Sequence, residues 1–534
     1  MTKGMTKPSA SSSHDDDGSS STSIFSSWAI LPPTLTILTC CKILLIPSYR
    51  STDFDVHRNW LAITHNLPLS EWYFDSAYGM TVHTLDYPPA FAYFEYLLSN
   101  NPLTNFLLKG DSRCRKILGD HENEQSDTCV IFQRSTVIVS DLILFLGAYV
   151  AVKGMYPESV NYQVKTFILL VLNPGLLWLD HVHFQYNGML LGVLLLSLGF
   201  LLEGHNVPKL DRSYHRYHLG GAALYALLIN LKHLYIPLGP LYFIYLFQHY
   251  CIDAHRNFLF SNFCRLAVVT ACSLMLPWLP FLLLTPNPTQ QFYQILRRLF
   301  PFQRGLVHDY WAANVWALYM FLDKLMTKVF SESLPEVPPF LCAMILVNIL
   351  LVPVTIKSIQ RQQIPISDTS LIQGWTKEGL IEAVVYTSLS AFMLAYHVHE
   401  KAILTALIPL TLLVYSKQSE TYKHLFFHMS VWGLLGLFPL LFQPAELALK
   451  IVSYLGYLAL CAYFLELPSK PGTRSFTLLL FKASLGMAAL VAVVLEVLPI
   501  PGRYEFLPLL ITSVTCAVAL IACWWVSFQL LISL

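Results

Sequence analysis

Acidic side chains that could do chemistry lie directly after the first apolar run of the chain. Asp53 and Asp55 follow this run, and Asp86 stands before Tyr87 and two prolines. A carboxylate can take a proton from an attacking hydroxyl group as a general base. A charge near a bilayer is costly, about 2.5–3.5 kcal/mol at the centre of a helix. We therefore predict that these carboxylates have a task at the membrane surface.

Each of these carboxylates also has a structural alternative. Asp53 or Asp55 could cap a helix that begins near Val56, and capping is favoured for Asp55 because it lies closer to that start. The pair also fits an Asp-x-Asp pattern that holds a divalent metal in many soluble enzymes, but three-residue matches are common by chance. Asp86 could fix the turn before Pro88, cap the next helix, or support a base or an acceptor.

Four further polar segments interrupt the apolar runs and could line one cavity. They span residues 179–188, 232–235, 297–311 and 396–401. In the first segment, His181 and His183 alternate like metal ligands, but two residues apart on a helix they point to different faces. Without a third ligand nearby we expect no zinc site. The pair then serves either a polar network or substrate contact.

Composition places these residues in a membrane protein. Of 534 residues, 55% are hydrophobic and 13% are charged, and the mean hydropathy is +0.51. Apolar runs recur along the chain and predict an all-α polytopic fold with about 11–14 transmembrane helices. The net charge of +1 and the lack of a clustered basic surface argue against a nucleic-acid partner.

The large polar loop after the first span is expected to lie at the membrane interface. Within the loop 47–134 we predict two interfacial helices, at Val56–Asn66 and at Ala90–Ser99, because each is bounded by proline and mixes aromatic with polar residues. Cys114 and Cys129 could form a disulfide if the loop faces an oxidising compartment, or remain free thiols. The span after the loop should begin near Val137.

The polar segments, read together, resemble a known family. The motifs are Asp53-Phe54 with Arg58 and Trp60, residues 85–89, 180–188 and 298–306, and His397 to Ile403. They resemble the endoplasmic-reticulum glucosyltransferases that use dolichyl-phosphate glucose to extend the N-glycan precursor. Residues 57–64 and 308–319 are most similar to the enzymes that add the second glucose, and the enzyme adding the first glucose is the alternative.

The resemblance implies a GT-C membrane fold and transfer of glucose to the mono-glucosylated lipid-linked oligosaccharide. The new α-1,3 bond would form with inversion, in the endoplasmic-reticulum membrane, with the active site facing the lumen. Asp53 matches the family's general base, and Asp86 would support it. No cofactor and no metal are implied; the partners are the two lipid-linked substrates and the bilayer. The remaining substrate-contacting candidates are Asp55, Arg58, Trp60, Tyr87, His181, His183, Gln185, Tyr186, Asn187 and Glu400.

A phosphate leaving group needs cations, and four side chains could supply hydrogen bonds or charge. Arg304 offers a bidentate fork, while Lys232 and Lys401 act as point charges. His399 could donate a further hydrogen bond. Glu400 would orient or neutralise one of these groups. For Lys401 the alternative is a lysine that extends to the interface at the end of a span.

The sequence also predicts a division of the chain. Residues 1–27 read as a disordered cytosolic tail, residues 28–330 as an N-terminal catalytic membrane module, and residues 331–534 as a C-terminal membrane module. A polytopic transporter of lipids or sugars is the alternative from another class, since charged groups within spans also mark transport pathways. A transporter should show two similar halves, and this sequence shows no internal repeat.

Overall fold

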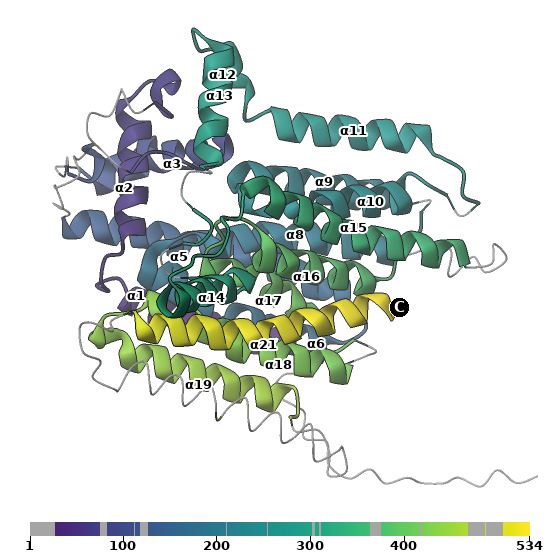
Figure 1. Cartoon of the computed structure of the whole chain (residues 1–534). Coiled ribbons are helices and arrows are strands. Elements are labelled where there is room, and N and C mark those ends of the chain that lie inside the picture. The colour runs from purple at the N-terminus through teal and green to yellow at the C-terminus, as the bar shows by residue number, and fades with distance from the viewer. Residues whose placement is uncertain are drawn as a thin grey trace, which may run out of the picture.

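The computed structural model of the chain is a bundle of helices (Figure 1). It describes residues 27–74, 83–109, 111, 113–117, 126–209, 211–253, 255–301, 305–308, 311–363, 375–416, 419–467, 486 and 506–533. Within these ranges there is no β-strand, and only two isolated β-bridges occur. The predicted all-helical fold is therefore confirmed. Apart from Ser27, the predicted tail lies outside the described residues.

The helices of the first part of the chain are α1 (Leu31–Leu44), α2 (Thr52–Asn66), α3 (Pro89–Asn100), α4 (Pro102–Leu107), α5 (Asp127–Met155), α6 (Val160–Val171), α7 (Pro174–Leu176), the π-helix η6 (Leu177–Phe184), α8 (Asn187–Asn206), α9 (Arg212–Leu231), α10 (Gly239–Tyr250), α11 (Phe260–Met275), α12 (Leu279–Leu283) and α13 (Pro288–Leu299). The later helices are α14 (Val315–Phe330), α15 (Pro339–Gln363), α16 (Lys377–Leu394), α17 (Leu404–Leu410), α18 (Ser419–Leu435), α19 (Leu447–Phe464) and α21 (Leu507–Ile532). Short 3-10 turns are η2 (Trp28–Ile30), η3 (Leu69–Glu71), η5 (Arg113–Arg115), η7 (His233–Leu238), η9 (Glu400–Ile403), η10 (Thr411–Leu413), η11 (Phe438–Leu440) and η12 (Pro444–Glu446).

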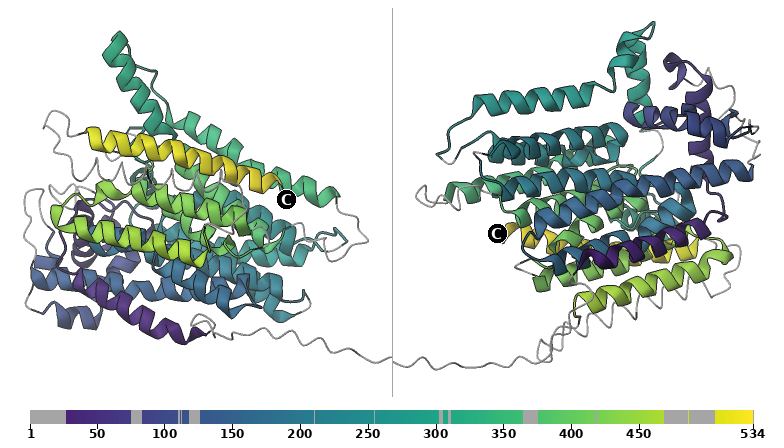
Figure 2. Two further views of the ribbon diagram at one scale, coloured as in Figure 1. Left: turned by 90° about the horizontal axis from the view of Figure 1, so that it is seen from below. Right: turned by 180° about the vertical axis from the view of Figure 1, so that it is seen from behind.

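Several helices have the length and composition of membrane spans. In the described part of the chain, six stretches qualify, namely Asp127–Met155, Val160–Phe184, Asn187–Asn206, Pro339–Gln360, Pro444–Phe464 and Leu507–Ile532. Most of the long helices share one direction in both views of Figure 2. The multi-pass membrane class is thus confirmed. The number of about 11–14 spans stays a prediction, because an apolar run near 476–495 lies outside the described residues except Gly486.

The two helices predicted in the first loop are present. The second is α3, which opens at Pro89. The first, α2, starts four residues earlier than expected because Ser51 caps it, its hydroxyl accepting from the Phe54 amide. The interpretation of Asp55 as the cap is therefore wrong. Asp53 and Asp55 instead occupy the first turn of α2, where the positive end of the helix dipole favours carboxylates.

A disulfide closes the end of the same loop. Cys114 and Cys129 are bonded, with their Cα atoms 5.2 Å apart, so the alternative of two free thiols is excluded. The bond joins η5 to the first turn of α5. Helix α5 begins at Asp127, ten residues before the predicted start near Val137, because the Ser126 hydroxyl accepts from the Cys129 amide.

Close packing between α5 and α8 fixes the segment that precedes α8. A Cβ on Gly192 would lie 2.6 Å from the backbone of Ile143, and one on Gly147 would lie 2.2 Å from the carbonyl oxygen of Gly192. Small residues allow two helix backbones to approach this closely. The π-helix η6 leads directly into α8, so this contact also sets the position of η6.

Candidate active site

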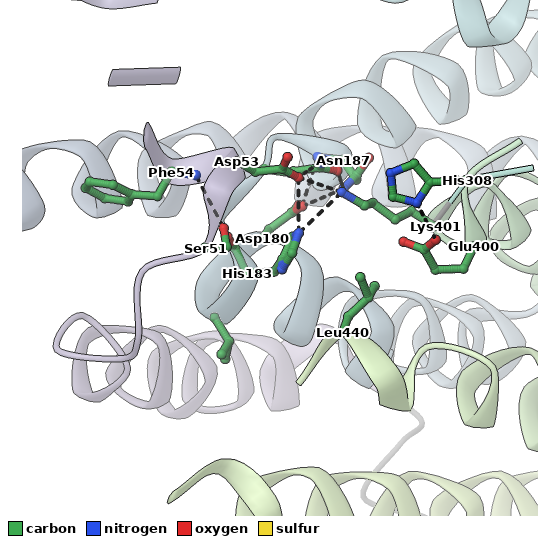
Figure 3. A network of polar contacts seen from close by, with 12 residues as sticks. Ser51, Asp53, Phe54, Asp180, His183, Asn187, His308, Glu400, Lys401 and Leu440 are labelled. Carbon is green, nitrogen blue, oxygen red and sulfur yellow. Dashed lines mark hydrogen bonds and ion pairs between the residues drawn. The ribbon is translucent and has the colours of Figure 1, made fainter. Parts of the chain in front are cut away.

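Asp53 is the centre of a polar network that draws on three distant segments (Figure 3). Its Oδ2 atom lies 2.5 Å from Nζ of Lys401 in η9 and 3.2 Å from Nε2 of His183 in η6. The side-chain amide of Gln185, just after η6, donates to the same oxygen. The carboxylate is 27% exposed, so a substrate can reach it. The predicted base therefore sits at the meeting point of three of the motifs.

The charge state of Asp53 follows from these contacts. Burial raises the pKa of Asp53, but the ammonium of Lys401 and the hydrogen bond and charge of His183 outweigh burial and hold the pKa well below its usual value. Asp53 is therefore ionised at neutral pH. Lys401 also lies 3.4 Å from Nε2 of His183. Lys401 is only 10% exposed and pairs with a carboxylate, so the alternative of a lysine that extends to the interface does not describe it.

A chain of amide hydrogen bonds holds Gln185 toward Asp53. The Asp180 carboxylate accepts from the Asn187 amide and side chain, each at 3.0 Å, and from the Gly188 amide at 2.5 Å. Asn187 in turn donates to Gln185 Oε1 at 2.8 Å. Gln185 can then present only its NH₂ group to Asp53. The hydrogen bonds within residues 180–188 thus fix the orientation of the Gln185 side chain, whose NH₂ group donates to Asp53.

The two histidines of η6 face different partners, as predicted. His181 Nε2 lies 2.8 Å from Asp141 Oδ2, and the same oxygen is 2.6 Å from Lys42 Nζ. His183 faces Asp53, and its other ring nitrogen is 3.0 Å from the Tyr49 hydroxyl. Both histidines therefore belong to polar networks, of which only the one around His183 includes the Asp53 carboxylate.

Arg134 fastens η6 to the segment before α2. Its guanidinium donates to the carbonyl oxygens of His181 and Val182 and, at 2.8 Å, to that of Tyr49. The same guanidinium lies over the Phe54 ring, 5.8 Å from its centroid. One side chain thereby connects the neighbours of His183 with the neighbour of Asp53. The Ser51 hydroxyl adds a second connection by donating to the His183 carbonyl.

A second histidine and a buried glutamate flank Lys401. The His399 ring lies against that of His308, with centroids 4.0 Å apart. Burial, followed by the charges of His308 and Lys401, keeps the pKa of His399 well below its usual value. Burial also raises the pKa of Glu400 to about 7. His399 is therefore a neutral hydrogen-bonding group at neutral pH, and Lys401 carries the positive charge beside it.

Lys232 forms the other cationic side of the site. It follows α9 and lies over the Tyr87 ring, 4.9 Å from the centroid. Burial and the charge of Lys401 lower its pKa to about 8, although Asp53, Asp180 and Asp86 act in the opposite direction. Asp86 therefore lies within the electrostatic reach of Lys232. Two partly buried cations, Lys232 and Lys401, and three carboxylates, Asp53, Asp86 and Asp180, therefore lie within electrostatic reach of one another.

Comparison with known proteins decides the family. Residues 38–527 match the ALG6, ALG8 glycosyltransferase family. The chain belongs to the ALG6, ALG8 glycosyltransferase family. A protein of Drosophila melanogaster named "Probable dolichyl pyrophosphate Glc1Man9GlcNAc2 alpha-1,3-glucosyltransferase" is 36% identical over 479 residues, which cover 84% of each chain. Proteins of Mus musculus and Arabidopsis thaliana that carry this name without "Probable" are 36% and 37% identical, over 78% of each chain.

Other predicted contact residues of this family member have structural partners. Arg58 is 2% exposed and donates to the Lys116 carbonyl at 2.6 Å. Trp60 is 1% exposed and donates to the Thr84 carbonyl at 2.9 Å. Asp55 lies near Arg58 rather than Asp53's partners, and burial raises its pKa. These contacts hold the loop together, and a substrate role for the three residues stays a prediction.

Tyr186 and Arg304 are the remaining predicted residues. The Tyr186 hydroxyl lies 2.7 Å from Thr136 Oγ1, and its ring packs among aromatic side chains of the loop. Arg304 lies outside the described residues.

Three charged residues of these networks, Arg134, Lys42 and Asp141, were not predicted from the sequence. A charge within an apolar span was the available signal for Lys42 and Asp141, and the same signal marks Arg134 near the start of α5.

Three side chains beside Lys401 have the composition of a metal site. His308, His399 and Glu400 offer ligand atoms that all lie within 4.8 Å of one another. Two imidazoles and one carboxylate suit several divalent metals. In contrast, the Asp-x-Asp alternative has no such geometry, because Asp53 faces Lys401 while Asp55 is turned toward other partners.

Proposed function

We propose that this family member transfers glucose from dolichyl-phosphate glucose to Glc1Man9GlcNAc2 on dolichyl pyrophosphate. The names of three relatives support this acceptor and the α-1,3 bond. They favour the second glucose over the first, and they favour transfer over transport. The observation that carries the proposal is the Asp53 carboxylate, ionised and partly exposed, with Lys401 beside it.

In this mechanism Asp53 is the general base. The acceptor 3-hydroxyl attacks C1 of the donor glucose, and its proton passes to Asp53 while the bond from C1 to the phosphate oxygen breaks. A β-linked donor then yields an α-linked product in one displacement. Lys401, Lys232 and neutral His399 stabilise the departing phosphate with charge and hydrogen bonds. Arg304 is the fourth proposed phosphate ligand.

Lys401 has two roles in succession. Without substrate, its ion pair with Asp53 keeps the carboxylate a weak base. A donor phosphate competes for the same ammonium, and its binding would release Asp53 and raise the pKa of that carboxyl. The base then gains strength only when the donor is in place, which disfavours proton transfer without a glucosyl donor.

An apolar cavity suits the lipid of the donor. A cavity of about 230 Å³ lies between α9, α11 and α13. Its walls are mostly aliphatic and aromatic, with Trp278 and Phe292 among them, and they include Pro88 and His233, the neighbours of Tyr87 and Lys232. A polyisoprenyl chain in this cavity would place its phosphate beside Lys232. The donor's identity rests on this chemistry and on the resemblance of the motifs.

We place the Asp53 loop in the lumen of the endoplasmic reticulum. The disulfide between Cys114 and Cys129 supports this side, because such bonds persist in oxidising compartments. We also propose that residues 28–330 and 331–534 act as two membrane modules. The active site joins them, since Asp53 belongs to the first and Lys401 to the second.

Transfer to defined acceptors tests the proposal. Purified protein receives synthetic dolichyl-phosphate glucose and lipid-linked Man9GlcNAc2 acceptors that carry no, one or two glucose units. Only the mono-glucosylated acceptor should be extended, by one α-1,3-linked glucose. Reaction of the acceptor without glucose would identify the enzyme that adds the first glucose. Release of the donor across a membrane without any transfer would instead favour the transporter.

A further inference from the structure

A polar cavity lies far from Asp53, at the other end of α2. Its volume is about 360 Å³, within the range of about 300–1,000 Å³ typical of small-molecule sites. It is lined by Ser70, Glu71, Phe74, Thr285, Pro286, Asn287, Gln290 and Gln291. One wall is η3, just after α2, and the other is the turn between α12 and α13. Figure 1 shows α12 and α13 on the side of the molecule that carries α2 and α3.

The separation from the reacting centre follows from helix geometry. Asp53 lies in the first turn of α2, and the first lining residue, Ser70, stands four residues after the last residue of α2. Fifteen helical residues rise by about 22 Å. A ligand in the cavity therefore cannot be the sugar that reacts at Asp53. The cavity is also distinct from the apolar one proposed for the donor lipid.

The chemistry of the lining selects the ligand class. Three side-chain amides, two hydroxyls, one carboxylate and one phenyl ring line the cavity, and none of the lining residues that the structure describes is Lys, Arg or His. Phosphate requires positive charge, so this cavity does not suit a phosphate or pyrophosphate group. Amides and a carboxylate match a neutral ligand rich in hydroxyl groups, and an aromatic ring can pack against its apolar face.

One lining residue has a hydrogen-bonding group without a partner. Gln291 is 3% exposed, and its Nε2 atom has no hydrogen-bond partner among the described residues. A buried amide left unpaired is unfavourable. This nitrogen has almost no accessible surface, so the polar character of the cavity comes from its other amides, its hydroxyls and its carboxylate.

The two walls are fastened to each other and to the catalytic loop. Gln294 on α13 donates to the Tyr73 carbonyl at 2.8 Å, and Arg298 donates to the same carbonyl at 3.3 Å and to Thr84 Oγ1 at 3.2 Å. Thr84 stands two residues before Asp86. The distance from cavity to reacting centre is thus fixed by direct contacts, as a site for two parts of one ligand requires.

We infer that this cavity binds a neutral hexose unit of the acceptor glycan, remote from the hydroxyl that reacts. The inference rests on the proposed function, in which the acceptor glycan has one glucose, nine mannose and two N-acetylglucosamine units, as the names of the relatives state. A glycan of this size can occupy both the Asp53 centre and the cavity at once. The cavity then selects full-length acceptors, because a shorter glycan fills only the reacting centre.

Two exposed lining residues allow a test with little risk to folding. Asn287→Ala and Gln290→Ala remove amides at the start of α13, and Thr289→Ala is the matched control, because Thr289 is exposed between them but does not line the cavity. Each amide variant should raise KM for the intact acceptor about fivefold, as expected for a lost hydrogen bond, and leave KM for the donor unchanged. The control should leave both unchanged.

A trimmed acceptor tests whether the variants act through the part of the glycan that the cavity binds. An acceptor reduced to its glucosylated arm should show a raised KM with the unaltered protein, and the amide variants should raise it no further. An equal effect of the variants on intact and trimmed acceptors, or no effect on either, would overturn the inference while glucose transfer itself continues.

Binding of free glycan separates the inference from the proposed function. Saturation-transfer NMR with free Man9GlcNAc2 and full-length protein in nanodiscs should show contact that Asn287→Ala with Gln290→Ala removes and Thr289→Ala retains. This result does not depend on turnover. A protein that binds the glycan in this way but transfers no glucose would refute the proposed function alone. If the double variant shows the same contact as the unaltered protein, the cavity site alone is refuted.

Discussion

At the scale of single residues, the pairing of Asp53 with Lys401 explains why two charges stand at the edge of a membrane. Each compensates for the other until a substrate arrives, and neither is buried without a partner. The sequence identified both residues from their chemistry. It could not identify the pairing, because 348 positions separate the two residues and nothing local encodes that contact.

Replacing the proposed base tests its role directly. Asp53→Asn should lower kcat by about 10²–10⁴-fold, because an amide cannot accept the proton. Asp127→Asn is the matched control and should have a small effect, since Asp127 also stands in the first turn of a helix, α5, but is exposed. Detergent-solubilised variants are compared by initial rate and by elution from a sizing column. Near-normal turnover by folded Asp53→Asn would assign the base role to Asp86.

The shifted pKa values of Asp53 and Lys232 predict a decline of donor use on the alkaline side. The pKa of Asp53 is held below its usual value, so its ionised form persists across neutral pH and produces no acidic limb there. The pKa of Lys232 is lowered to about 8, so its positive charge is present below pH 8 and is lost as the pH rises above it. We expect kcat/KM for the donor to fall on the alkaline side, by about tenfold per unit.

An arginine substitution provides the check on this profile. Lys232→Arg should remove the alkaline limb, because arginine stays charged up to about pH 12. Lys153→Arg is the control, since Lys153 also lies over a tyrosine ring, at 5.2 Å from the Tyr149 centroid, but is far along α5. An alkaline limb that persists unchanged in Lys232→Arg would show that another group produces it.

At the scale of elements, the loop helices were predictable and the π-helix was not. Prolines and cap residues mark the ends of α2 and α3 in the sequence, although the cap is Ser51 and not Asp55. The π-helix η6 departs from ordinary helical spacing, and Phe184 leaves it with φ at 82°, a strained value for a side chain of this size. Such strain persists only where tertiary contacts hold the backbone in place. A local sequence pattern does not reveal these contacts, so the π-helix could not be predicted from it.

Arg134 is the side chain that should hold this strained element in place. Arg134→Lys retains the charge but loses the fork that reaches three carbonyl oxygens. A displacement of about 1 Å at the reacting centre can lower the rate by about 10²-fold. We therefore expect kcat to fall by roughly this factor, with little change in KM for either substrate. Arg212→Lys, at the exposed start of α9, is the control.

The split between kcat and KM distinguishes positioning from a general loss of structure. If Arg134 only stabilised the fold, activity per correctly folded molecule would stay normal and the melting temperature alone would fall. A rise in KM for the donor with unchanged kcat would instead place Arg134 among the substrate ligands. Thermal melting and steady-state kinetics on the same preparations give both readings.

At the scale of the whole molecule, composition predicted the class, and the motifs predicted the residues of the site. The arrangement in space came only from the fold, which brings Gln185, just after η6, to Asp53 over 132 positions and Lys401 of η9 over 348. The motifs identified most of these side chains because catalysis requires charged and amide groups that an apolar span otherwise excludes. The charge of Arg134 near the start of α5 was a signal as well, but its contacts could not be predicted, because its partners are backbone carbonyls, which any sequence supplies.

Topology is the property of the whole chain on which the proposed reaction depends, since the base and the acceptor glycan must share one side of the membrane. If the Asp53 loop faces the lumen, as proposed, a glycosylation sequon introduced within residues 122–126 should be used, while one near residue 11, in the tail proposed to be cytosolic, should stay unmodified. In a variant whose only cysteines are Cys114 and Cys129, a thiol reagent should label neither residue until a reductant opens their disulfide. Modification of the tail but not of the loop would place Asp53 opposite its acceptor, and the catalytic assignment would then fail for the molecule as a whole, whatever the activity of single variants.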